Sequence, residues 1–285
     1  MMTAGAAHAA GLGLAAAAIW GAADFAGGLA ARRAGPSLVV LLAHGSSIFL
    51  LLLAVFLWHI PLPSEHLASI ALLSGAANGL ALLCFYEALA LDTMGLPAAV
   101  AGVLTAVLPV LVSMVQEGRP TLGQMSGFAL AVVAIWLIAV TPGGKPHPRG
   151  LGLAVLAGIG FGIQLTLLHI AGRGGVVWAM TWSRIAGALV AGAALPFAKR
   201  AVRGSSRGLA AVVALAVVAG IFDTGGNVCY TFASLMGRLD IAAVLASLYP
   251  AGTILLAALL LRERTTRRQT VGMGLALAAV ALIAA

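Results

Sequence analysis

The chain has 285 residues, of which 62% are hydrophobic and only 8% are charged, and its mean hydropathy is +1.09. A soluble domain carries about 25% charged residues, so this composition cannot cover a water-exposed surface. It therefore excludes a soluble enzyme, a disordered chain and a nucleic-acid-binding protein, although the net charge is +8. The basic residues fall in short loops between apolar stretches, as expected of a polytopic membrane protein.

Ten apolar stretches are long enough to cross a membrane, since a span needs roughly 17 to 25 apolar residues. The N-terminal segment 1–10 contains no Lys or Arg, so we expect the first stretch to remain a helix rather than act as a cleaved signal peptide. The sequence predicts helices over about 9–31, 37–58, 67–91, 95–116, 122–140, 150–171, 175–198, 209–236, 239–261 and 270–285.

The two halves of the chain repeat each other at a shift of 145 residues. The matching pairs include Gly75 with Gly220, Cys84 with Cys229, Gly127 with Gly272 and, at a shift of 146, Glu117 with Glu263. Matched glycines, cysteines and glutamates indicate a repeat more strongly than matched alanines do in so biased a composition. We therefore predict a first repeat over 1–140, a polar linker over 141–149 and a second repeat over 150–285.

Loop charges orient the two repeats in opposite directions. The loops after odd-numbered spans hold 12 basic residues, whereas those after even-numbered spans hold only Arg119, Arg173 and Arg238. The positive-inside rule then places the odd loops in the cytoplasm and both termini outside. Inverted-topology repeats are the architecture of secondary transporters. We predict an all-α membrane protein with ten transmembrane helices arranged as two inverted five-helix repeats.

Several short motifs suggest a family. They are Trp20-Gly21, the segment Cys84-Phe85-Tyr86-Glu87-Ala88-Leu89-Ala90-Leu91, Ala246-Ser247-Leu248-Tyr249-Pro250 followed by Leu260-Leu261-Arg262-Glu263-Arg264, and Gln269-Thr270-Val271-Gly272. On these motifs the whole chain resembles the EamA-type members of the drug/metabolite transporter superfamily, which include the YddG-like amino-acid exporters. The resemblance implies a multi-pass exporter of a bacterial-type inner membrane. It also implies a central cavity lined by helices 1, 3, 4, 6, 8 and 9, with helices 5 and 10 to the side.

Polar side chains inside the predicted spans indicate where that cavity lies. Asp223, Asn227 and Tyr230 share one helix face, and the repeat shift maps Asp223 onto Asn78. Intramembrane polar groups are costly and are functional by default, although a structural contact between two helices is the alternative. We predict a substrate cavity formed by Trp20, Asn78, Phe85, Gln164, Asp223, Asn227, Tyr230 and Tyr249.

Four other ionisable residues are candidates for gating or proton coupling: Asp24, Glu87, His169 and Arg184. Each has a structural alternative. Asp24 and Glu87 lie in the cytoplasmic thirds of their helices, from which a side chain can reach the interface. His169 could be an interfacial residue, and Arg184 must pair or extend to the interface, with Asp223 as one candidate partner.

These features predict a secondary transporter that exports small neutral or zwitterionic metabolites by alternating access, with amino acids of apolar or aromatic side chain as the leading substrates. The chain lacks His-Glu-x-x-His, paired-Asp and Cys-x-x-Cys motifs, so we expect no enzyme activity, no metal and no cofactor. The expected partners are a small-molecule substrate and membrane lipid, with no nucleic acid, and the oligomeric state is open, a monomer included. A channel or a lipid-scaffold membrane subunit is the alternative.

Overall fold

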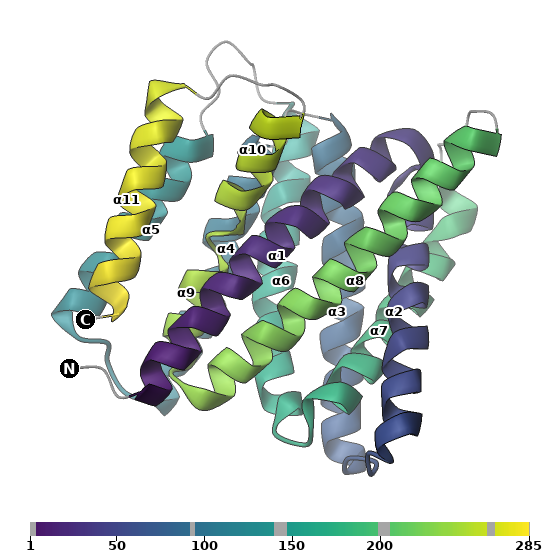
Figure 1. The fold of residues 1–285 in the computed structure, drawn as a ribbon, viewed down its shortest axis with the longest axis horizontal. Helices are drawn as coiled ribbons and strands as arrows, with labels where there is room; N and C mark the ends of the chain where they lie inside the picture. Colours follow the sequence, from purple (N-terminus) through teal and green to yellow (C-terminus); the bar gives the residue numbers. More distant parts are fainter. Residues whose placement is uncertain (1–3, 92–94, 140–146, 199–205, 261–265, 285) are drawn as a thin grey trace.

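The computed structural model describes residues 4–91, 95–139, 147–198, 206–260 and 266–284 as a bundle of long helices (Figure 1). Every regular element in these ranges is helical. The elements are α1 (Ala4–Ala34), α2 (Pro36–Trp58), α3 (Glu65–Leu91), α4 (Gly95–Gln116), α5 (Leu122–Ala139), α6 (Pro148–Gly172), α7 (Val176–Ala194), the 3-10 turn η1 (Leu195–Phe197), α8 (Ser206–Met236), α9 (Leu239–Ala246), α10 (Tyr249–Leu260) and α11 (Arg267–Ala284).

Local turn chemistry accounts for the boundaries between neighbouring helices. Gly35 has a positive φ of 79°, which lets the chain reverse after α1, and Pro36 then opens α2, where its missing N–H costs no hydrogen bond. Gly118 and Gly175 adopt positive φ values in the same way, after α4 and before α7. The helices consequently begin and end within a few residues of the predicted spans.

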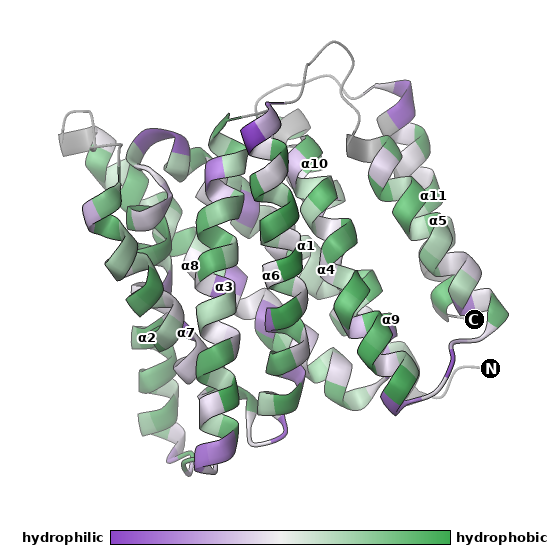
Figure 2. Cartoon of the chain, turned by 180° about the vertical axis from the view of Figure 1, so that it is seen from behind, coloured by the Kyte–Doolittle hydropathy of each residue, from purple (hydrophilic) through white to green (hydrophobic). Residues whose placement is uncertain are grey.

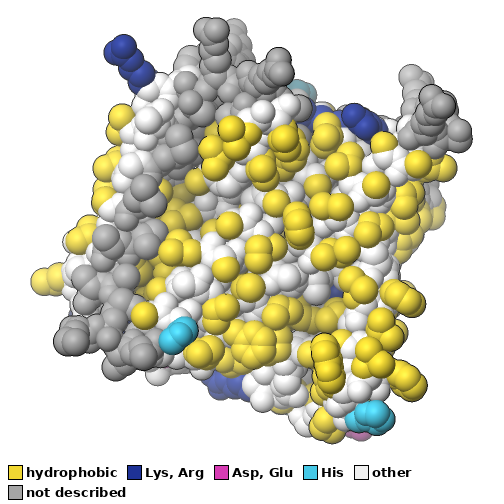
Figure 3. Space-filling model, in the orientation of Figure 1, with side chains coloured by type: hydrophobic (Ala, Val, Ile, Leu, Met, Phe, Trp, Pro, Cys, Tyr) yellow, Lys and Arg dark blue, Asp and Glu magenta, His cyan; other side chains and the backbone are white. Residues whose placement is uncertain are grey.

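The outside of the bundle is apolar over the length of the helices (Figures 2 and 3). Phe49, Phe56 and Trp58 are 69%, 75% and 70% exposed. A soluble protein rarely exposes so large a continuous apolar surface. Within the described residues, eight helices are long and apolar enough to cross a membrane, and α5 contributes a shorter apolar stretch over Leu122–Leu137. The chain is an integral, multi-pass membrane protein.

The predicted ninth span, 239–261, is confirmed as an apolar helical span over Leu239–Leu256, but its helix is interrupted. It is divided into α9 and α10, which are separated by Ser247 and Leu248. Pro250 explains the position of this break. A proline ring clashes with the carbonyl four residues earlier, which here is that of Ala246 at the end of α9. Pro109, by contrast, lies inside α4, which continues to Gln116.

The helices pack in a pattern that leaves a central core and one lateral pair. α1 packs along α8 and α10, α3 packs along α6 and α7, and α2 contacts α7 and α8. α4 lies against α6 and α9. The pair α5 and α11 lies to one side (Figure 1). The core of the bundle is therefore surrounded by α1, α3, α4, α6, α8 and α10.

Glycine permits the closest of these helix contacts. A Cβ added to Gly75 would overlap the backbone of Ser183 on α7, and one added to Gly220 would overlap the backbone of Ala43 on α2. Close approach through small residues is the usual packing mode of membrane helices. The segment 158–162 also packs this way, since a Cβ on Gly158 would meet Leu104 of α4 at 2.6 Å. Its glycines therefore allow close helix packing.

Candidate functional site

A small cavity lies at the centre of the bundle, where six helices meet. Its volume is about 30 Å³, measured as the space that the centre of a water molecule can occupy. This is room for about two or three waters, because one water needs roughly 10–15 Å³ on that measure. The lining residues are Trp20 and Asp24 of α1, Asn78 and Leu82 of α3, Thr105 of α4, Phe161, Gln164 and Leu165 of α6, Asp223 and Asn227 of α8, and Tyr249 of α10.

An ion pair joins α7 to α8 beside this cavity. Arg184 Nη1 lies 2.5 Å from Asp223 Oδ2, and the Arg184 residue is only 1% exposed. The same nitrogen lies 3.2 Å from His44 Nε2 and donates a hydrogen bond of 3.1 Å to Asn78 Oδ1. Arg184 thus pairs with Asp223, the partner proposed from the sequence, and it also contacts α2 and α3.

Amide side chains extend the polar network across the cavity. Asn227 Nδ2 donates to Asp223 Oδ1 at 3.1 Å, and Gln164 Nε2 donates to Asn227 Oδ1 at 2.8 Å. Ser74 Oγ in turn donates to the Gln164 carbonyl oxygen at 3.0 Å. A continuous set of hydrogen bonds therefore runs from α7 through α8 to α6 and α3, and it fixes the cavity wall on that side.

Aromatic rings form the opposite part of the wall. The Trp20 ring centroid lies 6.3 Å from that of Tyr249 and 6.0 Å from that of Tyr230. Phe85 lies edge-on to Tyr249 at 6.2 Å and to Phe161 at 5.6 Å. Edge-to-face pairs at these separations are favourable. Phe85 and Tyr230 are fully buried and do not line the cavity, so they support the rings that do.

The remaining predicted residues fall in different places. Asp24 lines the cavity and is only 7% exposed, so it does not extend to the interface. Glu87 lies at the end of α3, where its carboxylate is 3.7 Å from Arg149. His169 lies toward the other end of α6, and its ring nitrogens are within 3.1 Å of Ser234 Oγ and Arg173 Nη2. Glu87 and His169 are therefore not cavity residues.

Sequence reasoning missed other residues of the site. His44 stands opposite Arg184, and its location inside the second span could have identified it. Thr105 and Phe161 line the cavity without any charge or periodicity that distinguishes them from packing residues. Leu82 and Leu165 likewise carry no sequence signal of their own, although Leu82 is the repeat counterpart of Asn227.

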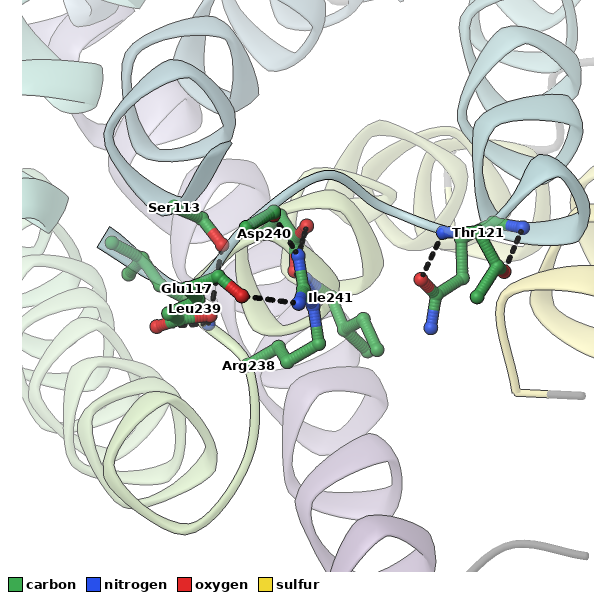
Figure 4. A network of polar contacts seen from close by, with 9 residues as sticks. Ser113, Glu117, Thr121, Arg238, Leu239, Asp240 and Ile241 are labelled. Carbon is green, nitrogen blue, oxygen red and sulfur yellow. Dashed lines mark hydrogen bonds and ion pairs between the residues drawn. The ribbon is translucent and has the colours of Figure 1, made fainter. Parts of the chain in front are cut away.

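A second polar cluster closes one end of the bundle between α4 and α9 (Figure 4). Arg238 donates two hydrogen bonds to the Asp240 carboxylate, at 3.1 and 2.7 Å, and others to the carbonyls of Glu117 and Gly118. The Glu117 carboxylate in turn accepts from the Leu239 N–H at 3.1 Å. The hydrogen bonds to Asp240 raise the pKa of Arg238, which lies outside the spans, so its charge persists. We refer to these residues as the α4–α9 contact.

Comparison with known proteins relates part of this chain to a transporter family. Residues 148–285, which form the predicted second repeat, match the EamA-like transporter family. This part of the chain, just under half of it, is similar to EamA-like transporter domains. EamA proteins are membrane transporters, so the channel alternative is not favoured. No curated protein matches the chain.

A solved crystal structure resembles the whole chain, with a TM-score of 0.76 and 17% sequence identity. The match covers 96% of this chain and 97% of that one. At this identity the likeness shows the fold alone.

Proposed function

We propose that this protein is a secondary transporter that exports small neutral or zwitterionic metabolites, with amino acids as the leading class, by alternating access through the central cavity. The observation that carries the proposal is the cavity itself. It is narrow, it is lined by polar and aromatic side chains from six helices, and it has room for about two or three waters. A larger solute can enter only when helices move apart, which is the behaviour of a transporter that occludes its site.

The helix contacts support two inverted repeats, 1–140 and 150–285, as the basis of this motion. The repeat shift equates α1 with α6, α2 with α7, α3 with α8, α4 with α9 and α10, and α5 with α11. The contact of α1 with α8 then corresponds to that of α6 with α3, and the contact of α2 with α8 to that of α7 with α3. The pairs α2 with α7 and α5 with α11 correspond to themselves. An approximate two-fold relation of this kind is expected of inverted repeats. Most of the proposed linker, 141–149, lies outside the described residues.

Polar contacts at both ends of the bundle supply the two gates that alternating access needs. At one end the α4–α9 contact joins α4 to the start of α9. At the other end Arg149 of α6 approaches Glu87 of α3, and Arg32 of α1 donates to the Leu89 carbonyl at 3.1 Å. We propose that one set opens while the other stays closed, with the repeats rocking about the central site.

The orientation in the membrane follows from the basic residues. Arg32, Arg33, Arg149, Arg267 and Arg268 lie at helix ends that the positive-inside rule assigns to the cytoplasm. Arg119, Arg173 and Arg238 lie at the other ends. Lys145, Lys199, Arg200, Arg203, Arg262 and Arg264 lie outside the described residues. The α4–α9 contact is then the outer gate of a transporter in a bacterial-type inner membrane.

Counterflow in proteoliposomes tests the proposal. Vesicles containing the full chain are loaded with one unlabelled amino acid at millimolar concentration: phenylalanine, tryptophan, leucine, lysine or glutamate. Uptake of labelled phenylalanine is then measured. We expect saturable uptake that is accelerated by internal phenylalanine, tryptophan or leucine and little affected by glutamate. Empty vesicles provide the control. Labelled uptake that is neither saturable nor accelerated by any internal amino acid would exclude this transport function.

A further inference from the structure

We propose that Asp24 binds the ammonium group of the transported solute. This inference rests on the proposed transport function and adds a chemical requirement to it: a substrate must carry a cationic amine, whereas a carboxylate is dispensable. The requirement follows from the charges around the cavity, from the burial of Asp24, and from the rings beside it.

The charges around the cavity do not cancel. Two carboxylates, Asp24 and Asp223, line it, and a single cation, Arg184, lies beside it. Arg184 approaches Asp223 and shares its remaining contacts with His44 and Asn78. With both carboxylates ionised, the site carries one uncompensated negative charge, which belongs to Asp24.

Asp24 is also held where water compensates its charge poorly. It is 7% exposed, and none of the hydrogen bonds or ion pairs among the described residues involves its side chain. α1 continues for ten residues beyond it, or about 15 Å at 1.5 Å per residue, so the side chain cannot reach the end of its helix.

Three other charged groups on α1 and on the helices that pack against it have partners elsewhere. On α3, Glu87 lies by Arg149 near the cytoplasmic end, and on α9, Asp240 pairs with Arg238 near the outer end. On α1 itself, Arg32 donates to the Leu89 carbonyl. A buried ionised carboxylate needs a cation or several donors, so Asp24 has to take up either a proton or a cation from outside the described protein groups.

The rings next to Asp24 suit an ammonium group. Trp20 lies four residues before Asp24, so the two side chains share one face of α1, and both line the cavity. Tyr249 lines it as well, at 6.3 Å from Trp20, and its buried hydroxyl has no hydrogen-bond partner among the described residues. Aromatic faces attract cations, and an unpaired hydroxyl in a cavity marks a place for a ligand atom. Leu82, Phe161 and Leu165 then receive the apolar part of the solute.

Three probes of similar size separate the charges of an amino acid. Phenylalanine has both charges, phenethylamine only the ammonium, and 3-phenylpropionate only the carboxylate. Binding of each probe to the purified full chain is measured at pH 7 by quenching of tryptophan fluorescence and by equilibrium dialysis. The variants are Asp24→Asn and, as a matched control, Glu65→Gln, because Glu65 is an exposed carboxylate at the start of α3.

We expect phenylalanine and phenethylamine, but not 3-phenylpropionate, to bind the native protein and Glu65→Gln. In Asp24→Asn both amines should bind at least about tenfold more weakly, because one member of a desolvated charge pair is removed. Counterflow by Asp24→Asn is measured in parallel. Equal binding of the amines to the native protein and Asp24→Asn would overturn the role of Asp24 while leaving the transport function in place.

One other outcome would also overturn the inference, and a special case of the first would give Asp24 a different role. Binding of 3-phenylpropionate as tight as that of phenethylamine would show that the ammonium group is not what the cavity recognises. Unchanged amine binding by Asp24→Asn, with only the pH dependence of counterflow lost, would assign Asp24 to proton transfer. If the native protein shows no counterflow and binds none of the probes, the proposed function itself fails, a result distinct from the others.

Discussion

Replacing Asp223 by Asn should destabilise the protein because it leaves a cation buried without its counter-charge. The substitution keeps the shape of the side chain and removes only the charge opposite Arg184. The Arg184 side chain is 2% exposed, so water cannot take over the role of the carboxylate. His44 and Asn78 remain as contacts of the guanidinium, but neither carries a negative charge.

The expected magnitude follows from the geometry. At the observed 2.5 Å and an effective dielectric constant of about 20, two unit charges attract each other by roughly 6–7 kcal/mol. Desolvation of both groups offsets much of this attraction, and removal of one member of a buried pair typically costs about 3–5 kcal/mol. We expect Asp223→Asn to lower the free energy of unfolding by an amount in that range. Replacing both partners, as in Arg184→Met with Asp223→Leu, should restore most of it, because no buried charge remains.

Unfolding in detergent by titration with sodium dodecyl sulfate measures these free energies for the native protein, for Asp223→Asn, for the single variants Arg184→Met and Asp223→Leu, and for their double variant. A double-mutant cycle isolates the interaction between the two side chains. A change of less than about 1 kcal/mol for Asp223→Asn, or strictly additive effects in the double variant, would show that the ion pair does not hold α7 to α8 as argued here.

Three further predictions concern packing, the outer gate and topology. Gly75→Ala should destabilise the bundle by about 1–3 kcal/mol in the same titration, because the added methyl meets the α7 backbone, whereas Gly192→Ala, with open space around it, should not. Arg238→Gln should lower the free energy of unfolding by about 1–3 kcal/mol and change the rate of counterflow, because Asp240 and the end of α4 lose their shared hydrogen-bond donor. An unchanged rate would show that the α4–α9 contact is not a gate. Reporter fusions at Ala285 and within 199–208, of which 199–205 and Ala285 lie outside the described residues, should give opposite signals, and a cytoplasmic C-terminus would refute the orientation.

The helix boundaries could be predicted from the sequence because their causes are local. Long apolar runs require a helix in lipid, and glycine or proline ends it, as at Gly35 and Pro36. The pairing of Arg184 with Asp223 could be proposed as well, since two opposite charges at membrane depth have few alternatives. A bend near Pro250 could be predicted too, because its ring clashes with the carbonyl of Ala246, but the division of this span into α9 and α10 was not predicted.

The composition of the cavity was only partly predictable. Charged and amide residues such as Asp223 and Asn227 stand out in an apolar span, but Thr105 and Phe161 resemble packing residues until the fold brings α4 and α6 together. The position of Asp24 depends on where α1 ends. The helix extends to Ala34, beyond the predicted residue 31, so Asp24 lies deeper than its sequence position indicated.

The central claim is that the cavity opens to one side of the membrane at a time, and reactivity of a cysteine at position 105 tests it most directly. Thr105→Cys is placed in a background in which Cys84 and Cys229 are replaced by serine. A second version also carries Gly118→Cys and Arg238→Cys, and these two cysteines are joined by a chemical cross-link across the α4–α9 contact. A membrane-impermeant thiol reagent is then applied from either side of oriented vesicles. Without the cross-link, the cysteine should react with reagent applied from either side. With the cross-link, it should react only from the side opposite the α4–α9 contact, and counterflow should be abolished. Reaction from both sides in the cross-linked protein would contradict this claim.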